Sequence, residues 1–478
     1  MNKIFLLVAL CGLFARAERP NVLFICIDDL RPQLNCYGED IMVTPNLDGL
    51  AATGRLFRNH YVQVPTCGAS RFALWSGRRP SKSGALGNGS FSMLPKTDTP
   101  DAHTLPQLLR KNGYTTASIG KVSHSPDGKV YSYGGDGDGP LEMPFSWDDT
   151  AMPLGRWVTG WDTFFAYADG TSRTQRQKNK TPWPPVEMHE GDDKSYPDGW
   201  IAEAAVAKLK ALKAGEKPFF YAVGFFKPHL PFTAPKRYWD LYDRSQIQLA
   251  PAPGKPEGIN KASWHGSGEM FKYGHRSDDR RNDPAHLRKL RHAYYACVSY
   301  TDAQVGKLLA ALDELGLRKN TLVVVWGDHG WHLGDNAIWG KHSLYDRALK
   351  SAFIVRTPGM KHPGVPTEGV IESLDIYPTI AELCQVPAPA YLTGRSFVRL
   401  LEDPAAPGKN GALGYWKNGR SLRSGAWRIT EYSKGSPAVE LYSHSADPHE
   451  TRNVASRHPE LVQKLLEQLR ADQPEYLQ

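Results

Sequence analysis

The sequence has few cysteines, no internal repeat and no apolar run that would span a bilayer comfortably. Six cysteines in 478 residues exclude a small scaffold built on disulfide bonds. The apolar run at residues 4–14 is shorter than a transmembrane helix requires. No block of Lys and Arg resembles a nucleic-acid-binding tail. We therefore expect a large globular chain with no nucleic-acid partner and no membrane span.

The composition is that of an ordinary folded protein. Apolar residues make up 41% and charged residues 23%, which allows a large core and argues against general disorder. The formal net charge is +8. A mildly basic surface and an anionic substrate both account for this charge, and composition alone does not separate them.

The first residues have the pattern of a signal peptide. Lys3 supplies a positive start, residues 4–14 an apolar core, and Ala15-Arg16-Ala17 a small-residue cleavage site. Cys11 follows Leu10, an unfavourable neighbour for a lipidated cysteine, so cleavage near Ala17 is favoured over lipidation. The prediction is export, to the periplasm or out of the cell.

Five cysteines remain after that cleavage, and an odd number in an exported protein points to one special cysteine. Cys67 is the candidate. The other four could pair with one another or be buried. Cys26 and Cys297 lie within apolar stretches, so buried thiols are predicted for these two.

Short apolar runs alternate with amphipathic helices, which predicts an α/β fold with a mostly parallel sheet. Strands are predicted at residues 22–27, 114–119, 219–225 and 321–326, and prolines at 387 and 389 suggest a linker. The predicted organisation is a signal peptide at 1–17, a large domain carrying the site at 18–386, and a smaller α+β domain at 387–478.

Two long segments lack periodicity, residues 125–197 and 251–283, and such segments inside a compact domain are often functional loops. The second is rich in basic side chains, which could bind a polyanion or form a solvated loop. These side chains are His265, His275, Arg276, Arg280 and Arg281.

Reactive side chains follow four of the predicted strands. Parallel strands place their carboxyl ends at one edge of a sheet, where α/β proteins bind ligands. Clustered carboxylates there suit a hard cation such as Ca²⁺ or Mg²⁺; the alternative is that they cap helices or loops. The residues are Asp28 and Asp29, Lys121 and His124, His229, and Asp328 and His329.

Cys67 precedes Ser70-Arg71 and a short run that reads as a helix ending before Gly77. Backbone amides at a helix start favour developing negative charge, and Arg71 one turn on could reach the same point. A buried structural cysteine is the alternative. Singly, Lys121, His124, His229, Lys341 and His342 could also be ordinary polar residues.

The run Cys67-Gly68-Ala69-Ser70-Arg71 resembles the Cys-x-Pro/Ala-x-Arg signature of type I sulfatases. The N-terminal start, the Asp375–Thr379 region and the C-terminal landmarks around Leu441-Tyr442 are also similar to that family. Within it, Asp328-His329 and Lys227-Pro228-His229 are closest to the iduronate-2-sulfatase branch and related bacterial polysaccharide sulfatases. The resemblance implies an alkaline-phosphatase-like sandwich, a large mostly parallel sheet between helices, with a smaller C-terminal α+β domain.

The resemblance also implies roles. Cys67 would be oxidised to formylglycine (3-oxoalanine) by a maturation enzyme, and one Ca²⁺ would be bound. Arg71 and Lys121 would orient the hydrated aldehyde, Lys341 would hold sulfate, His229 would protonate the leaving oxygen, and His124 would act as a base. The implied metal ligands are Asp28, Asp29, Cys67, Asp328 and His329.

The predicted activity is hydrolysis of sulfate from sugars of an extracellular polysaccharide, such as a uronate 2-sulfate, ulvan, fucoidan or carrageenan. Two alternatives remain open. One is a phosphoesterase of the alkaline-phosphatase superfamily. The other is a non-catalytic relative that binds glycans through loop tryptophans, namely Trp147, Trp157, Trp161, Trp183 and Trp200.

Overall fold

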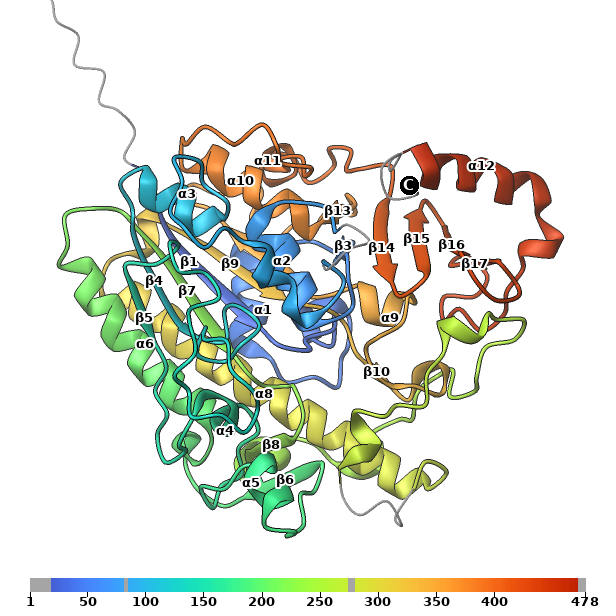
Figure 1. Ribbon diagram of the computed structural model, residues 1–478, viewed down its shortest axis with the longest axis horizontal. Helices are drawn as coiled ribbons and strands as arrows, with labels where there is room; N and C mark the ends of the chain where they lie inside the picture. Colours follow the sequence, from blue (N-terminus) through green and yellow to red (C-terminus); the bar gives the residue numbers. More distant parts are fainter. Residues whose placement is uncertain (1–18, 81–84, 274–279, 472–478) are drawn as a thin grey trace, which may run out of the picture.

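A seven-stranded, mostly parallel sheet organises the computed structural model, which describes residues 19–80, 85–273 and 280–471 (Figure 1). Only β12 runs antiparallel to its neighbours within this sheet. The four strands predicted from apolar runs all belong to it, which confirms the α/β prediction. In spatial order the strands are β2 (Arg55–Leu56), β12 (Phe353–Arg356), β9 (Thr321–Gly327), β1 (Asn21–Ile27), β7 (Phe219–Phe225), β4 (Thr115–Gly120) and β5 (Asp149–Ala151).

Helices cover both faces of the sheet, so the central strands are apolar throughout. Alternate β1 side chains enter different cores: Leu23, Ile25 and Ile27 pack with α1, α6 and α8, whereas Phe24 packs against Trp75 of α2. The helices are α1 (Pro45–Thr53), α2 (Cys67–Ser76), α3 (Leu105–Lys111), α4 (Gly160–Phe164), α5 (Arg173–Lys178), α6 (Pro197–Lys213), α7 (Lys236–Trp239), α8 (Pro284–Glu314), α9 (Asp346–Leu349), α10 (Ile376–Leu383), α11 (Val398–Glu402) and α12 (Pro459–Ala471).

The register of the central strands brings their carboxyl ends to one level. Ile27 of β1 is paired with Gly327 of β9 and with Phe225 of β7. The next residues continue the ladder, because the Asp28 amide donates to Phe225 O at 3.3 Å and the Asp328 amide donates to Ile27 O at 3.2 Å. Two aspartates far apart in sequence therefore lie side by side.

A four-stranded antiparallel sheet lies beside the main body with α12 across it (Figure 1). The sequence pattern at residues 427–432 and 439–442 predicts its last two strands, and β14 and β15 are not predicted. The short strands and this sheet comprise β3 (His60–Tyr61), β6 (Val186–His189), β8 (Phe232–Pro235), β10 (His332–Leu333), β11 (Trp339–Gly340), β13 (Ile371–Glu372), β14 (Ala412–Trp416), β15 (Gly419–Ser424), β16 (Trp427–Tyr432) and β17 (Val439–Ser443).

The predicted domain boundary at residues 386/387 stays a proposal. Phe397, Leu400 and Leu401, which follow the predicted linker, belong to the core of the main sheet. The segment up to β14 thus packs on the large body, and the small antiparallel sheet begins at Ala412.

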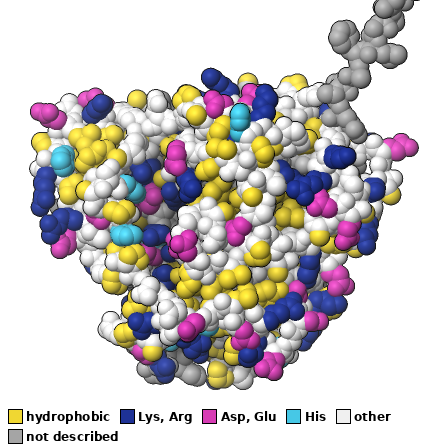
Figure 2. Space-filling model, turned by 180° about the vertical axis from the view of Figure 1, so that it is seen from behind, with side chains coloured by type: hydrophobic (Ala, Val, Ile, Leu, Met, Phe, Trp, Pro, Cys, Tyr) yellow, Lys and Arg dark blue, Asp and Glu magenta, His cyan; other side chains and the backbone are white. Residues whose placement is uncertain are grey.

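Five cysteines lie within the described residues, and none of them is in a disulfide. Cys26 and Cys297 are fully buried, as predicted. The predicted signal peptide, residues 1–17, falls outside the described residues. Of the helices in the described part, none is both long and apolar enough to cross a membrane. On the face shown in Figure 2, acidic and basic side chains are interspersed rather than gathered into one area of a single charge.

Candidate active site

The predicted reactive residues converge at the carboxyl edge of the sheet. Asp28 and Asp29 follow β1, Lys121 follows β4, His229 follows β7, and Asp328 and His329 follow β9. Cys67 approaches them as the first residue of α2, and Lys341 follows β11. All eight side chains are buried.

Cys67 lies at the centre of this group. Its Sγ is 3.4 Å from Asp28 Oδ1, 3.4 Å from His329 Nε2 and 3.2 Å from Lys341 Nζ. Burial is the largest influence on its thiol and raises the pKa to about 12. An unmodified Cys67 is therefore a protonated thiol and a weak nucleophile at neutral pH.

The backbone around Cys67 is fixed by a close approach of two segments. The Gly68 amide donates to Asn88 Oδ1 at 3.0 Å, and the Thr66 hydroxyl donates to the same oxygen at 3.1 Å. A Cβ on Gly68 would lie 2.4 Å from the Asn88 Cα, so only glycine fits there. Gly77 ends the helix with φ of 64°, as predicted.

Four of the five predicted metal ligands form one cluster. Donor atoms of Asp28, Asp29, Cys67 and His329 all lie within 4.8 Å of one another. Asp29 Oδ2 is buried and accepts no hydrogen bond within the described structure, although an ionised carboxylate normally has several partners. Carboxylate oxygens, one of them unsatisfied, fit a hard divalent cation.

Asp328, the fifth predicted ligand, adjoins this cluster and is already engaged by protein groups. Its Oδ1 accepts the Asp29 amide at 2.9 Å. Its Oδ2 is 3.1 Å from both Nε and Nη2 of Arg71. Arg71 therefore orients Asp328, and its Nη1 also donates to Lys121 O at 2.6 Å.

Three cations face three carboxylates in this centre. Lys121 pairs with Asp28, and Lys341 Nζ is 2.8 Å from Asp29 Oδ1. Burial opposes ionisation of Asp28, but Lys121 and other nearby cations hold its pKa well below the usual range. For Asp29 burial dominates and raises the pKa well above the usual range. The two adjacent aspartates thus differ in how well the protein stabilises their charge.

His229 is held by the loop after β7. Its Nδ1 is 2.7 Å from Leu230 O, which leaves Nε2 facing Glu269 Oε1 at 3.3 Å. The buried Lys227 donates to the His229 carbonyl at 2.9 Å and to the Pro231 carbonyl at 2.6 Å. Burial, followed by the nearby Lys341, lowers the pKa of His229 to about 4.

His124 lines the same cavity as Cys67. Its ring packs edge-on against Trp161 at a centroid distance of 5.5 Å. Its Nδ1 is buried and has no hydrogen-bond partner in the described part of the chain. Burial and then Lys121 lower its pKa well below the usual value, so the ring is neutral and could accept a proton.

A cavity of about 620 Å³ opens above Cys67. Of the loop tryptophans considered for glycan binding, Trp161 and Trp183 line it, and Trp147 and Trp157 instead pack into the protein interior. Sequence reasoning missed several lining residues that carry no motif and come from irregular segments or a hairpin. Those residues include Asn88, Tyr133, Arg173, Glu269, Lys272, Trp416 and Lys417.

The predicted basic segment at 251–283 contributes only partly. His265 lines the cavity, with Glu269 four residues later. Arg281 lies over the Phe271 ring at 4.6 Å. The predicted contributions of His275 and Arg276 lie outside the described residues.

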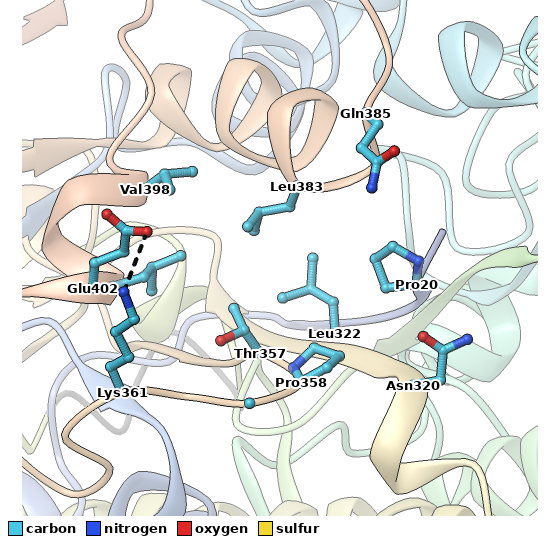
Figure 3. A pocket seen from close by; sticks show the side chains of 12 residues that line it. Pro20, Asn320, Leu322, Thr357, Pro358, Lys361, Leu383, Gln385, Val398 and Glu402 are labelled. Carbon is cyan, nitrogen blue, oxygen red and sulfur yellow. Dashed lines mark ion pairs between the residues drawn. The ribbon is translucent and has the colours of Figure 1, made fainter. Parts of the chain in front are cut away.

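A second cavity of about 300 Å³ lies at the opposite edge of the sheet (Figure 3). It is bordered by the starts of β1 and β9, and its charged side chains Lys361 and Glu402 pair at 3.9 Å. Among its described lining residues there is no cysteine, no histidine and no cluster of metal-ligating groups, so the reactive residues point to the first cavity.

Comparison with known proteins defines the class. The fold is the sulfatase, alkaline-phosphatase-like fold: it superimposes on a phosphonate monoester hydrolase of Agrobacterium radiobacter with a TM-score of 0.76 at 21% identity, covering 96% of each chain. BT4656, solved in complex with its substrate D-glucosamine-2-N,6-O-disulfate, superimposes with a TM-score of 0.72 at 19% identity, covering 95% of this chain and 98% of that one.

The sulfatase family model matches residues 20–386, and the chain therefore belongs to the sulfatase family of sulfuric-ester hydrolases. A model for the C-terminal region of N-sulphoglucosamine sulphohydrolase matches residues 327–475. A sulfatase of Formosa agariphila is 31% identical over 95% of this chain and 89% of its own. Human iduronate 2-sulfatase is 30% identical over 81% of this chain and 76% of its own.

Proposed function

We propose that this sulfatase removes sulfate from sugars of an extracellular polysaccharide, through a formylglycine made from Cys67 and with one bound Ca²⁺. The observation that carries the proposal is the position of Cys67. It begins a buried helix, touches Asp28, His329 and Lys341, and borders a cavity walled by aromatic and cationic side chains.

Formylglycine would supply, as its hydrate, a hydroxyl nucleophile that a protonated thiol cannot provide. The surrounding residues would orient it. Lys341 is already 3.2 Å from the Cys67 sulfur, and Lys121 lies beside Asp28. Arg71 would act by fixing Asp328, since its contacts run to that carboxylate. These cations would also offset the charge of the sulfate oxygens.

A divalent cation would be held by Asp28, Asp29, Asp328, His329 and the modified Cys67. When bound, it would polarise sulfate oxygens and so favour attack at sulfur. Asp29 is well placed for this because its buried Oδ2 accepts no hydrogen bond from the described residues. Calcium suits the carboxylate-rich set, because it accepts many oxygen ligands in a flexible geometry.

His229 would protonate the leaving sugar oxygen. Its pKa of about 4 without substrate is too low for a general acid at neutral pH. A sulfate ester brings negative charge beside the ring and would raise that pKa, with Glu269 at 3.3 Å supporting the imidazolium. His124, neutral and with a free Nδ1, would accept the proton that accompanies sulfate release.

Maturation would have to precede folding. Cys67 is 4% exposed and its sulfur contacts Lys341 and His329 within the cavity, so a modifying enzyme could not reach it in the folded protein. We propose that this enzyme acts on the unfolded chain, and that the signal peptide with cleavage near Ala17 directs export. The two-domain division at residues 386/387 belongs to the same proposal.

The sugar is proposed from relatives and from the cavity. Human iduronate 2-sulfatase is named for a sulfated sugar, and BT4656 was solved with a disulfated glucosamine. Trp183 offers a stacking surface at the cavity, whereas Trp161 is 2% exposed and covered by neighbouring rings. Candidates are a 2-sulfated uronic acid or an algal sulfated polysaccharide such as ulvan, fucoidan or carrageenan. The structural likeness to a phosphonate hydrolase makes phosphoester hydrolysis the competing activity.

The test uses sulfate and phosphate esters of one aryl alcohol, followed by a panel of sulfated oligosaccharides. We expect faster sulfate release, together with formylglycine at Cys67 by mass spectrometry of the peptide from the native host. Faster phosphate release would overturn the sulfate assignment. An unmodified thiol in an inactive protein would favour the glycan-binding alternative.

A further inference from the structure

The active-site cavity is also lined by three cations that form no ion pair within the described residues. Lys121 and Lys341, deep in the cavity, pair with aspartates. Arg173, Lys272 and Lys417 line the same cavity, and within the described residues none of the three has a carboxylate at ion-pair distance. Among the described residues that line the cavity, the only carboxylate is that of Glu269, which faces His229 and Lys341.

Arg173 is the most firmly positioned of these cations. Its guanidinium lies 3.5 Å from the Phe165 ring centroid, and its Nη1 donates to the Tyr273 hydroxyl at 3.3 Å. Its Nε is buried and has no hydrogen-bond partner among the described residues. The backbone is fixed too, because Ser172 and Gln175 form a capping box around the start of α5.

An aromatic wall connects Arg173 with the catalytic groups. Phe165, under the guanidinium, is 6.4 Å from the His229 ring and packs against Phe164 at 4.8 Å. Phe164 in turn lies 3.9 Å from Lys121 Nζ. Arg173 is thus one aromatic ring away from the group proposed to protonate the leaving oxygen, a separation suited to a second substituent on the same or the adjoining sugar.

We propose that Arg173 binds a second anionic group of the substrate, a carboxylate or a further sulfate, and so selects multiply charged glycans. The proposal rests on the sulfated-sugar function above. A planar guanidinium held by stacking matches the geometry of either anion and needs little reordering to bind it. Lys272 and Lys417 line the same cavity without an ion pair in the described part of the chain, and they would add long-range attraction.

The experiment compares matched substrates that differ only in the second charge. One pair is a sulfated uronate and its methyl ester; the other is a disulfated glucosamine and its N-acetylated monosulfate. The ratio of kcat/KM within each pair is measured for the wild type and for Arg173→Ala and Arg173→Met, of which the second keeps apolar packing on Phe165. Arg176→Ala is the control, because Arg176 lies on the same helix, stacks on Tyr167 at 3.9 Å, pairs with Asp169 and does not line the cavity.

We expect the wild type to prefer the doubly charged member of at least one pair. Both Arg173 variants should lower that preference about 10- to 100-fold, the range for a lost charge-assisted hydrogen bond, mainly through KM. Arg176→Ala should leave the preference unchanged. The pair that responds identifies the second group as carboxylate or sulfate.

The proposal is overturned if the wild type has no preference in either pair, or if Arg173 and Arg176 variants change the ratios equally. Failure of the underlying function would look different. A wild type that releases sulfate from neither pair, nor from the aryl sulfate and the oligosaccharide panel, contradicts the proposed function itself. Sulfate release without charge preference, or from the aryl sulfate but neither pair, contradicts only the role of Arg173.

Discussion

Within its described residues, the protein contains two clusters of potential metal-ligating side chains. In both, the donor atoms lie close together, but the two clusters differ in how many hydrogen bonds and ion pairs protein groups make to them. The active-site cluster consists of Asp28, Asp29, Cys67 and His329, and the interdomain cluster of Asp346, His444 and Glu450. Within each, the donor atoms lie within 4.8 Å of one another. Either could be taken for a metal site on that criterion alone.

The interdomain cluster is closed by protein groups. Arg428, fully buried on β16, donates through Nε to Glu450 Oε1 at 2.7 Å and through Nη2 to Asp346. Glu450 Oε2 accepts the Asp346 amide at 2.7 Å, and His444 Nε2 is 3.1 Å from Glu450 Oε1. The Arg428 guanidinium thus occupies the position that a metal cation would take. Because Asp346 begins α9 and Arg428 lies on β16, these contacts join α9 to the antiparallel sheet.

In the active-site cluster, by contrast, the described protein groups do not provide a hydrogen bond for every carboxylate oxygen. Asp29 Oδ2 has no hydrogen bond, and burial raises the Asp29 pKa. At the interdomain cluster burial also acts against charge, but Arg428 lowers the Asp346 pKa far below its usual value. Unsatisfied buried charge marks a site kept for a ligand, and satisfied charge marks a joint between parts of the fold.

The largest expected effect is on the active-site cluster. Cys67→Ser, made in a host whose maturation system modifies only cysteine, should lower kcat/KM for an aryl sulfate by at least about 10⁴-fold, because the covalent route is lost. Thermal unfolding should change little, since serine fits the space of the thiol. Retained activity without formylglycine would contradict the assignment of Cys67.

A substitution in the interdomain cluster should lower stability and leave activity unchanged. Glu450→Gln leaves Arg428 with a weaker partner in a buried position, so the free energy of unfolding should fall by about 3 kcal/mol. Activity at a temperature where the variant is folded should remain near that of the wild type. Denaturant unfolding measures the loss, and Glu460→Gln, at an exposed position on α12, is the control. A full loss of activity in folded Glu450→Gln would break the distinction between the clusters.

Calcium binding separates the clusters next. Chelation should lower both activity and the unfolding temperature, and added Ca²⁺ should restore them, with a stabilisation of about 2.7 kcal/mol at one hundred times Kd. Asp29→Asn should abolish this calcium response. Asparagine tolerates the Asp29 backbone, whose φ is 58°, so the fold should persist.

Glu450→Gln should keep the calcium response of the wild type. The measurement is thermal unfolding of each variant with chelator and with Ca²⁺. If Glu450→Gln lost the calcium response and Asp29→Asn kept it, the metal would bind at the interdomain cluster, and the proposed ligand set would be overturned.

Much of the active-site cluster was predictable because parallel strands share an edge. The apolar runs located β1, β4, β7 and β9, and the residues after them supplied Asp28, Lys121, His229 and Asp328. The in-register pairing of Ile27 with Gly327 then makes adjacency a geometric consequence. Function was less accessible from these residues alone, and the family signature around Cys67 was needed to name it.

The rest of the site could not be read from the sequence for physical reasons. Glu269 and Arg173 come from segments without periodicity, so nothing in the sequence sets their direction. Trp416 and Lys417 come from the turn between β14 and β15, and their approach to the cavity depends on how that sheet packs against the main body. The interdomain cluster was missed for the same reason, since Asp346 and Arg428 are brought together only by that packing.

The smallest expected effect is the loss of folding stability at acidic pH. The pKa of Asp346 is lower in the folded protein than in the unfolded chain. As the pH falls below about 4, the unfolded chain takes up the proton first. The stabilisation that ionised Asp346 contributes is therefore present above about pH 4 and is lost below it. Wild-type stability should therefore fall more steeply below pH 4 than that of Asp346→Asn, by about 1.4 kcal/mol per pH unit for one proton. Urea unfolding between pH 5 and 3 measures both slopes. Equal slopes would mean that Arg428 does not hold Asp346 in its ionised form, and the interdomain cluster would then lose the feature that distinguishes it from the active-site cluster.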